Sequence, residues 1–130
     1  MHCARRRVLC LRAAAYPYVR HFDRSQTVVA GRSLVLECRA WGWLPPTVTW
    51  FRGGQQLTRD IDSRVTLSQE LGRPNGSRLI IDGVEETDRA YYTCVATSDE
   101  WDSQDNATVL VRVKGKLTSV HVIISDDSIV

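Results

Sequence analysis

Short runs in which apolar residues occupy every second position recur along the middle of this 130-residue chain. In the first run Leu34, Leu36 and Cys38 alternate with outward positions, and Leu79 occupies an equivalent inward position further on. A period of two is typical of a strand with one buried face. The same reasoning predicts further strands over residues 47–52, 77–81, 90–97 and 107–113. We expect Leu36 and Leu79 to lie in the core.

Turn signals separate these runs, and no helical periodicity lies between them. The segments rich in Gly, Pro or acidic residues are Gly31, Gly53-Gly54, 72–76 and 98–105. Weaker strand signals cover 17–23, as an edge strand, and also 28–29, 55–57 and 65–69. Many short strands with no helices predict an all-β, two-sheet antiparallel sandwich. No internal repeat is visible, so we expect one copy of the fold.

One spacing of aromatic residues and cysteines is specific. Trp50 follows Cys38 by twelve residues, and Tyr92 precedes Cys94 by two. The sequence from Leu79 to Cys94 resembles the E–F signature of the immunoglobulin superfamily. The sequence from Pro46 to Gly54 resembles the C-strand region of its intermediate set (I-set), found in cell-adhesion and axonal receptors. The resemblance covers about Ser25 to Val113.

The resemblance implies how these residues are used. Cys38 and Cys94 should join the two sheets by a disulfide, with the Trp50 indole packed against it. The Tyr92 hydroxyl should bond a backbone group at the turn that precedes its strand. Such a disulfide is typical of an oxidising compartment, and closing its loop should stabilise the fold by about 4 kcal/mol.

Arg64 and Asp88 are a candidate ion pair. In related domains an arginine at the start of the fourth large strand often binds the acid before the Tyr-x-Cys motif. A forked guanidinium matches a carboxylate in geometry. The alternative is an unpaired Arg64 in solvent, and the sequence leaves both open.

Charge and composition divide the chain into three segments. We expect residues 1–24 to be a basic and disordered or incomplete leader, 25–114 the immunoglobulin-like domain, and 115–130 a C-terminal tail. The first segment holds six Arg against one Asp, and the remainder has a net charge of −3 (eleven Lys/Arg, fourteen Asp/Glu). A mildly acidic domain argues against nucleic-acid binding.

Export signals are incomplete in this chain. Arg12 interrupts the apolar run after Arg5-Arg6-Arg7 before it reaches the length of a signal peptide. No stretch approaches the ~20 apolar residues of a membrane-spanning helix. We expect a fragment or alternative form whose leader and anchor lie elsewhere, or an atypical export signal. No role can be assigned to Cys3 and Cys10.

A second, shorter resemblance lies near the C-terminus. Residues 107–117 are similar to the end of the last domain in the basigin, neuroplastin and embigin group. In that group a basic junction leads into a membrane helix. Here it leads to residues 118–130, which contain His121, Asp126 and Asp127. Membrane attachment would therefore need an anchor outside this chain.

Two Asn-x-Ser/Thr patterns are candidate glycosylation sites. They begin at Asn75 and Asn106. Occupancy of both is expected if the chain is exported. The pattern also arises by chance, and Asn75-Gly76 is independently a turn dipeptide.

Candidate binding residues gather in two expected loops. The first carries Trp101 beside Asp99 and Glu100, and the second carries Trp43. Loops at a sandwich end and exposed Trp side chains both favour recognition. The alternatives are a solubilising loop whose Trp folds back on the sheet, and a Trp41–Trp43 pair with one ring buried. The acidic loop lacks a Gly-punctuated calcium motif, so no metal is expected.

Enzymatic chemistry is not expected. The three histidines, His2, His21 and His121, lie in the expected head or tail, outside the sandwich core. No histidine can therefore be placed beside a serine or cysteine nucleophile. No glycine-rich phosphate loop or Cys-x-x-Cys pair is present. We expect no cofactor and no small-molecule substrate.

The resemblance implies a cell-surface or extracellular recognition module. Its partners would be proteins, bound homophilically or heterophilically, with neuronal adhesion and axon guidance as typical settings. Two rival hypotheses remain: a structural spacer in a multi-domain receptor, and a soluble decoy without an anchor.

Overall fold

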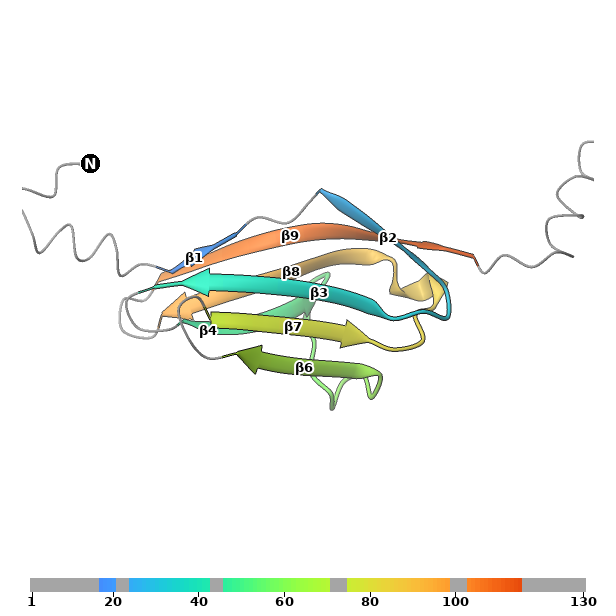
Figure 1. Cartoon of the computed structure of the whole chain (residues 1–130), viewed down its shortest axis with the longest axis horizontal. Coiled ribbons are helices and arrows are strands. Elements are labelled where there is room, and N and C mark those ends of the chain that lie inside the picture. Colours follow the sequence, from blue (N-terminus) through green and yellow to red (C-terminus); the bar gives the residue numbers. More distant parts are fainter. Residues whose placement is uncertain (1–16, 21–23, 43–45, 71–74, 99–102, 116–130) are drawn as a thin grey trace, which may run out of the picture.

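Two β-sheets pack face to face in the computed structural model, which describes residues 17–20, 24–42, 46–70, 75–98 and 103–115 (Figure 1). The four-stranded sheet has the spatial order β1 (Tyr18–Val19), β3 (Leu34–Trp41), β7 (Asn75–Ile81) and β6 (Val65–Glu70). The five-stranded sheet has the order β2 (Ser25–Val29), β9 (Ser103–Lys114), β8 (Ala90–Ser98), β4 (Thr47–Arg52) and β5 (Gln55–Gln56). A single 3-10 turn, η1 (Glu86–Asp88), connects β7 to β8 within these residues. The predicted all-β sandwich is confirmed.

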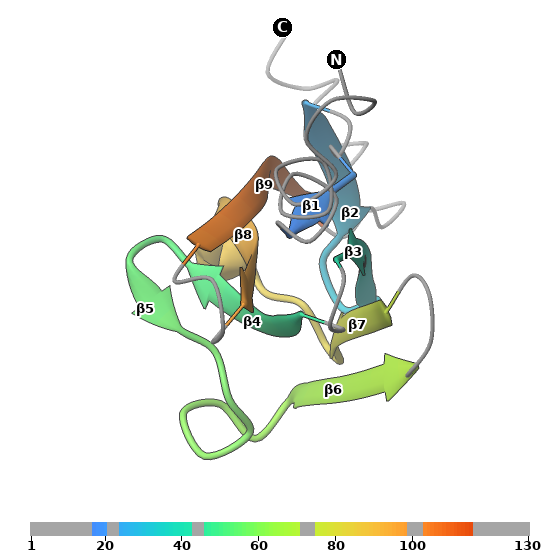
Figure 2. The same cartoon turned by 90° about the vertical axis from the view of Figure 1, so that its left-hand side faces the viewer.

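One pairing differs from the expected antiparallel arrangement. β2 and β9 run parallel, with Ser25 opposite Leu110 and Val29 opposite Lys114. The chain reaches this position by leaving the first sheet after β1 and joining the second at β2. Figure 1 and Figure 2 show β1 and β2 at the same edge of the sandwich, following one another along β9. The second sheet is therefore mixed: β2 runs parallel to β9, and its other pairings are antiparallel.

Strand β3 shows why the central strands could be predicted. Its residues alternate strictly between buried and exposed from Leu34 to Trp41. Leu36 lies opposite Leu79 on β7, and both side chains are buried in the core. Alternation specifies the register here, since a slip of one residue would turn every apolar side chain to solvent.

Two expected turn segments are shorter than predicted. Asn75 and Gly76, placed in a turn by the sequence pattern, already belong to β7 and pair with Ala40 and Arg39. Strands β8 and β9 likewise extend into the expected acidic loop, since Ser98 pairs with Ser103. Backbone hydrogen bonds continue the ladders through polar residues, which the side-chain pattern does not reveal.

The N-terminal boundary also differs. Tyr18 and Val19 form an edge strand on β3, upstream of the expected domain start at residue 25. The strand predicted over 17–23 covers only Tyr18 and Val19 among the described residues, because Arg20 lies outside β1. Residues 21–23 lie outside the described residues. Across the described ranges, no helix is long and apolar enough to span a membrane.

Candidate functional site

The disulfide between Cys38 and Cys94 links the two sheets through the core, as expected. Their Cα atoms lie 6.4 Å apart, on β3 and β8. Trp50 is Cys94's neighbour across the β4–β8 ladder and is almost fully buried. The aromatic ring is therefore placed beside the covalent link by the strand register itself.

A hydrogen bond that the sequence did not predict joins the same two sheets. The Trp50 Nε1–H donates to Ser77 Oγ at 2.8 Å. Ser77 is buried on β7 and lies opposite Cys38. The indole and its serine partner thus form a second link between the sheets next to the disulfide.

The turn before β8 is held by Tyr92, as the resemblance implied. Its hydroxyl donates to the backbone carbonyl of Asp88 at 2.7 Å, and its ring is fully buried. Burial raises the pKa of the Tyr92 hydroxyl, although the nearby Arg52 opposes this effect. The phenol therefore stays neutral and acts as a donor that locks the turn.

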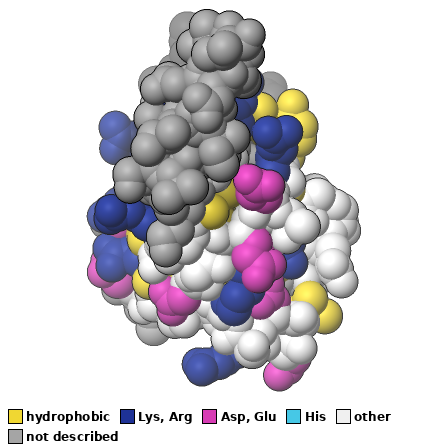
Figure 3. All heavy atoms as spheres, turned by 90° about the vertical axis from the view of Figure 1, so that its right-hand side faces the viewer, with side chains coloured by type: hydrophobic (Ala, Val, Ile, Leu, Met, Phe, Trp, Pro, Cys, Tyr) yellow, Lys and Arg dark blue, Asp and Glu magenta, His cyan; other side chains and the backbone are white. Residues whose placement is uncertain are grey.

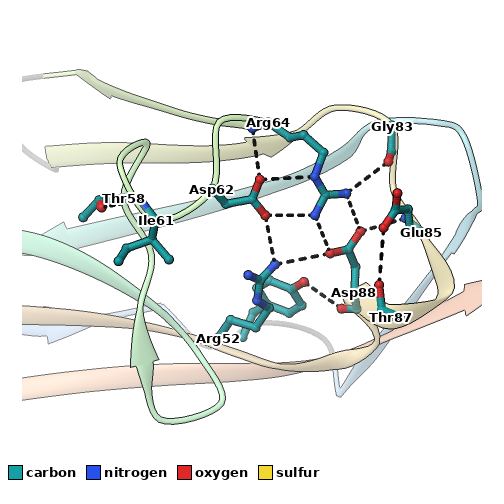
Figure 4. A network of polar contacts seen from close by, with 10 residues as sticks. Arg52, Thr58, Ile61, Asp62, Arg64, Gly83, Glu85, Thr87 and Asp88 are labelled. Carbon is teal, nitrogen blue, oxygen red and sulfur yellow. Dashed lines mark hydrogen bonds and ion pairs between the residues drawn. The ribbon is translucent and has the colours of Figure 1, made fainter.

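The Arg64–Asp88 pair is present and bidentate (Figure 4). Arg64 Nη1 lies 2.8 Å from Asp88 Oδ2, and Nη2 lies 2.9 Å from Oδ1. Asp88 also accepts the backbone N–H of Glu85 at 2.7 Å, which caps η1. The alternative of an unpaired Arg64 in solvent does not hold.

Two residues that sequence reasoning missed complete this cluster. Asp62 Oδ2 lies 2.8 Å from Arg64 Nη2, and its Oδ1 accepts the Arg64 backbone N–H at 3.0 Å. Arg52 Nη1 lies 3.2 Å from Asp88 Oδ1 and 3.5 Å from Asp62 Oδ2. We call these four residues the arginine–aspartate cluster. The sequence did hold one indication of the role of Arg52. It lies two residues after Trp50 on β4, so its side chain leaves the strand on the same inward side.

The cluster shifts the ionisation of its members. Hydrogen bonds from Arg64 hold the pKa of Asp62 below its ordinary value, despite partial burial. Burial would raise the pKa of Asp88, but bonds from Arg64 and the Glu85 N–H and the two arginine charges outweigh it and lower the pKa. The pKa of Arg64 is raised by its two carboxylates. Asp62, Asp88 and Arg64 are therefore charged at neutral pH, and their contacts with one another stabilise this end of the sandwich.

The end of the sandwich seen in Figure 3 carries both signs of charge. Lys or Arg side chains and Asp or Glu side chains are intermixed there, with only scattered apolar groups. A large field of a single sign, as nucleic-acid binding would require, is not visible on this side.

The two sequons lie in different environments. Asn106 is exposed on β9, between inward-facing neighbours. Asn75 is only 8% exposed, and its Nδ2, the atom that would carry a glycan, donates to the Pro46 carbonyl at 3.1 Å. This placement does not favour a glycan at Asn75 in the folded state, and the expected turn position was wrong.

The candidate binding residues are not placed by the structure. Asp99, Glu100 and Trp101 lie in 99–102, and Trp43 lies in 43–45, all outside the described residues. Trp41, the neighbour of Trp43 in the expected aromatic pair, is partly exposed at the end of β3. The binding role of these loops stays a prediction.

Histidines and grouped acidic residues are the side chains from which a catalytic or metal site could be built. His2, His21 and His121 lie outside the described residues. Within the described ranges no three His, Cys, Asp or Glu side chains are grouped to hold a metal ion.

Residues 17–113 match the family described as the immunoglobulin I-set domain. The chain belongs to this family. The family and its titin-like structural neighbours are typically non-enzymatic. The further resemblance to the basigin group is not shown by these comparisons and stays a prediction.

Several curated relatives are similar to this I-set chain. Neural cell adhesion molecule 1 of Bos taurus is 31% identical, covering 73% of the chain and 11% of the relative. Vascular endothelial growth factor receptor 3 of Danio rerio is 30% identical, covering 95% and 8%. The fast-type myosin-binding protein C of Mus musculus is 35% identical, covering 70% and 8%. The I-set chain thus spans about a tenth of the length of each of these three relatives.

Solved structures agree with this fold. The titin domains z1z2 in complex with telethonin superpose with a TM-score of 0.68 at 25% identity. The match covers 78% of this chain and 49% of the titin chain in that structure. The N-terminal Ig1-2 module of the Drosophila receptor protein tyrosine phosphatase DLAR gives the same TM-score and identity, covering 78% and 50%.

Proposed function

We propose that this I-set domain is a protein-recognition module of an adhesion or receptor protein at the cell surface or in the extracellular space. The observation that carries the proposal is the family match together with relatives whose names denote a cell-adhesion molecule and a growth-factor receptor. Homophilic or heterophilic contact, neuronal adhesion and axon guidance are the more specific forms of the same proposal.

The physical basis is a preformed scaffold. The disulfide and the neighbouring Trp50–Ser77 hydrogen bond hold the sheets together at one position, and the arginine–aspartate cluster does so at a second. A scaffold that is already ordered loses little conformational entropy when a partner binds its faces or loops. Recognition then depends on which side chains the scaffold presents.

A cell-binding experiment tests this function. The purified chain, multimerised on streptavidin, is added to a panel of neuronal and epithelial cells and measured by flow cytometry. We expect saturable binding that is lost after protease treatment of the cells. The proposal would be contradicted if the chain showed saturable binding to none of the cell types and did not bind a second copy of itself.

We further propose that the loops carrying Trp43 and Trp101 contribute to recognition. Trp43→Ala and Trp101→Ala should each lower cell binding, with Asp99→Ala and Glu100→Ala as smaller changes. Trp50→Ala is unsuitable as a control because that side chain is buried. Tyr91→Ala, on the exposed face of β8, is the matched control.

A structural spacer is the second candidate function. It is favoured by the small share, about a tenth, that the domain represents of the adhesion molecule and the growth-factor receptor named above. The spacer predicts that a longer native protein binds equally well when Trp43 and Trp101 are replaced. A soluble decoy is tested separately, by fractionating expressing cells into medium and membrane.

A further inference from the structure

Two exposed aromatic rings pack against each other at the outer edge of the four-stranded sheet. Tyr18 on β1 pairs directly with Trp41 on β3, and their ring centroids lie 5.7 Å apart at an angle of 51°. Tyr18 is 55% exposed and Trp41 is 36% exposed. Neither ring belongs to the buried core, so their packing leaves apolar area available to a partner.

Two arginines flank this aromatic pair on the same face. Val19 and Ala40 pair across the ladder and point into the core, where both are fully buried. Because neighbouring residues of a strand point to opposite sides, Tyr18 and Trp41 face solvent, as does Arg39. Arg20 is exposed, and its backbone N–H donates to the Arg39 carbonyl at 3.3 Å. We call Tyr18, Arg20, Arg39 and Trp41 the β1-edge patch.

The arginines of this patch differ from the described arginines that form ion pairs. Arg78, in the same sheet, lies 2.6 Å from Glu37, and Arg52 and Arg64 bind the cluster aspartates. Across the described residues, neither Arg20 nor Arg39 forms an ion pair. The patch therefore combines accessible aromatic area with positive charge that these residues do not neutralise.

The patch is also firmly positioned. The Val19 backbone N–H donates to Asp105 Oδ2 on β9 at 2.8 Å, which ties the short edge strand to the opposite sheet. Figure 1 shows β1 lying beside the end of β3 and the start of β9. A short strand held on two sides presents its side chains with little freedom left to lose on binding.

We propose that the β1-edge patch is a docking surface for an acidic segment of a protein partner. Trp, Tyr and Arg are the residues that dominate binding energy in protein interfaces. Arginine forks pair with carboxylates, and the aromatic rings would contact the apolar parts of the same segment. This inference rests on the proposed recognition function and names the surface and partner chemistry.

The surrounding charges favour a protein segment over an anionic polysaccharide. Glu37 and Glu70 lie exposed on the same face as Arg39 and line one shallow hollow with it. A short acidic segment can use both unpaired arginines, whereas a long polyanion would find no continuing row of unpaired cations along the described part of the sheet, because Arg78 is already paired with Glu37. The footprint is thus compact, with a mixture of aromatic and cationic groups.

Binding of two defined probes tests the inference. A fluorescent 15-residue peptide of alternating Glu and aliphatic residues and a fluorescent heparin octasaccharide are titrated into the full chain, with fluorescence anisotropy as readout. We expect saturable binding of the peptide that weakens as salt is raised. Arg39→Glu, Trp41→Ala and Tyr18→Ala should each weaken it by about tenfold or more.

Matched controls lie on the other sheet. Tyr91→Ala and Arg112→Glu make the same kinds of change at exposed positions of β8 and β9, and should leave peptide affinity within about twofold. Circular dichroism melting of every variant shows that the fold is retained. Equal weakening by the controls, no peptide binding, or tighter binding of the octasaccharide would each overturn the proposal.

The cell-binding measurement separates this inference from the function on which it rests. If the wild-type chain binds cells and the Arg39→Glu and Trp41→Ala variants bind equally well, the recognition function holds and the β1-edge patch is wrong. If the wild-type chain binds no cells, the recognition function fails whatever the peptide titration shows.

Discussion

The indole of Trp50 donates a 2.8 Å hydrogen bond to the hydroxyl of Ser77, across the space between the two sheets. Trp50 neighbours one cysteine of the disulfide along its ladder, and Ser77 neighbours the other. The covalent link and the hydrogen bond therefore restrain the same cross-section of the core. This relationship leads to the first of four predictions.

Ser77→Ala should lower the free energy of unfolding by about 1 kcal/mol, the net value of a hydrogen bond between neutral groups. Trp50→Phe should cost more, because it also removes buried ring area. Urea denaturation of oxidised protein made in bacteria measures both changes, without the glycosylation that the Ser77 substitution would affect. Equal stability of Ser77→Ala and wild type would contradict the prediction.

Asp88 should matter more to stability than Asp62, although both bind Arg64. The Asp88 side chain is 3% exposed and the Asp62 side chain 13%. Asp88→Asn removes a buried charge that two arginines share, and we expect a loss of about 2–3 kcal/mol, reduced by the partial exposure of Arg64. Asp62→Asn should cost less, about 1 kcal/mol. Chemical denaturation decides the order, and a larger loss for Asp62→Asn would contradict it.

Acid should weaken the fold through the same cluster. The pKa values of Asp88 and Asp62 are lowered in the folded state, so the unfolded chain binds protons first as the pH falls. Their contribution to stability is complete above the ordinary Asp pKa of about 4 and is lost as the pH falls through the lower folded values.

Melting temperatures measured from pH 7 down to pH 3 should therefore fall chiefly below about pH 5. The Asp88→Asn variant should show a shallower fall over this range, because it no longer carries that titrating group. An identical pH dependence in wild type and variant would assign the acid sensitivity to other residues.

Glycosylation should distinguish the two sequons. Asn106 is exposed, whereas the Asn75 amide is buried and bonded to the Pro46 carbonyl. In secreted protein from mammalian cells we expect a glycan on Asn106 and none on Asn75. Intact mass before and after glycosidase treatment, compared for Asn106→Gln and Asn75→Gln, checks this. A glycan retained in the Asn106→Gln variant would contradict it.

Sequence pattern predicted the β3, β4 and β8 strands well, because β3 and β8 bury every second residue along most of their length and β4 buries Trp50. Leu36 and Trp50 are inward in the structure as the alternation required. It predicted the ends of β7 and β9 poorly. Asn75 and Ser103 are polar, yet both belong to strands because their backbones pair with a neighbouring strand. Backbone pairing cannot be read from the polarity of the side chains.

The arginine–aspartate cluster was predicted in part. Arg64 and Asp88 follow from the family resemblance, but Asp62 and Arg52 were missed. Arg52 lies at the end of β4 and Asp88 lies on η1, so the distance between them depends on how these two elements pack against each other. Sequence spacing carries no information about that approach.

The sequence alone determined the sandwich, its disulfide and its core, since alternation and cysteine–tryptophan spacing depend on local periodicity and on one strongly constrained motif. Only the tertiary structure decided that β1 and β2 divide between the sheets, that Asn75 is buried, and that Tyr18 and Trp41 meet beside Arg39. Those three outcomes depend on contacts between segments far apart in the chain, where the packing of the sheets, and no local preference, fixes the neighbours.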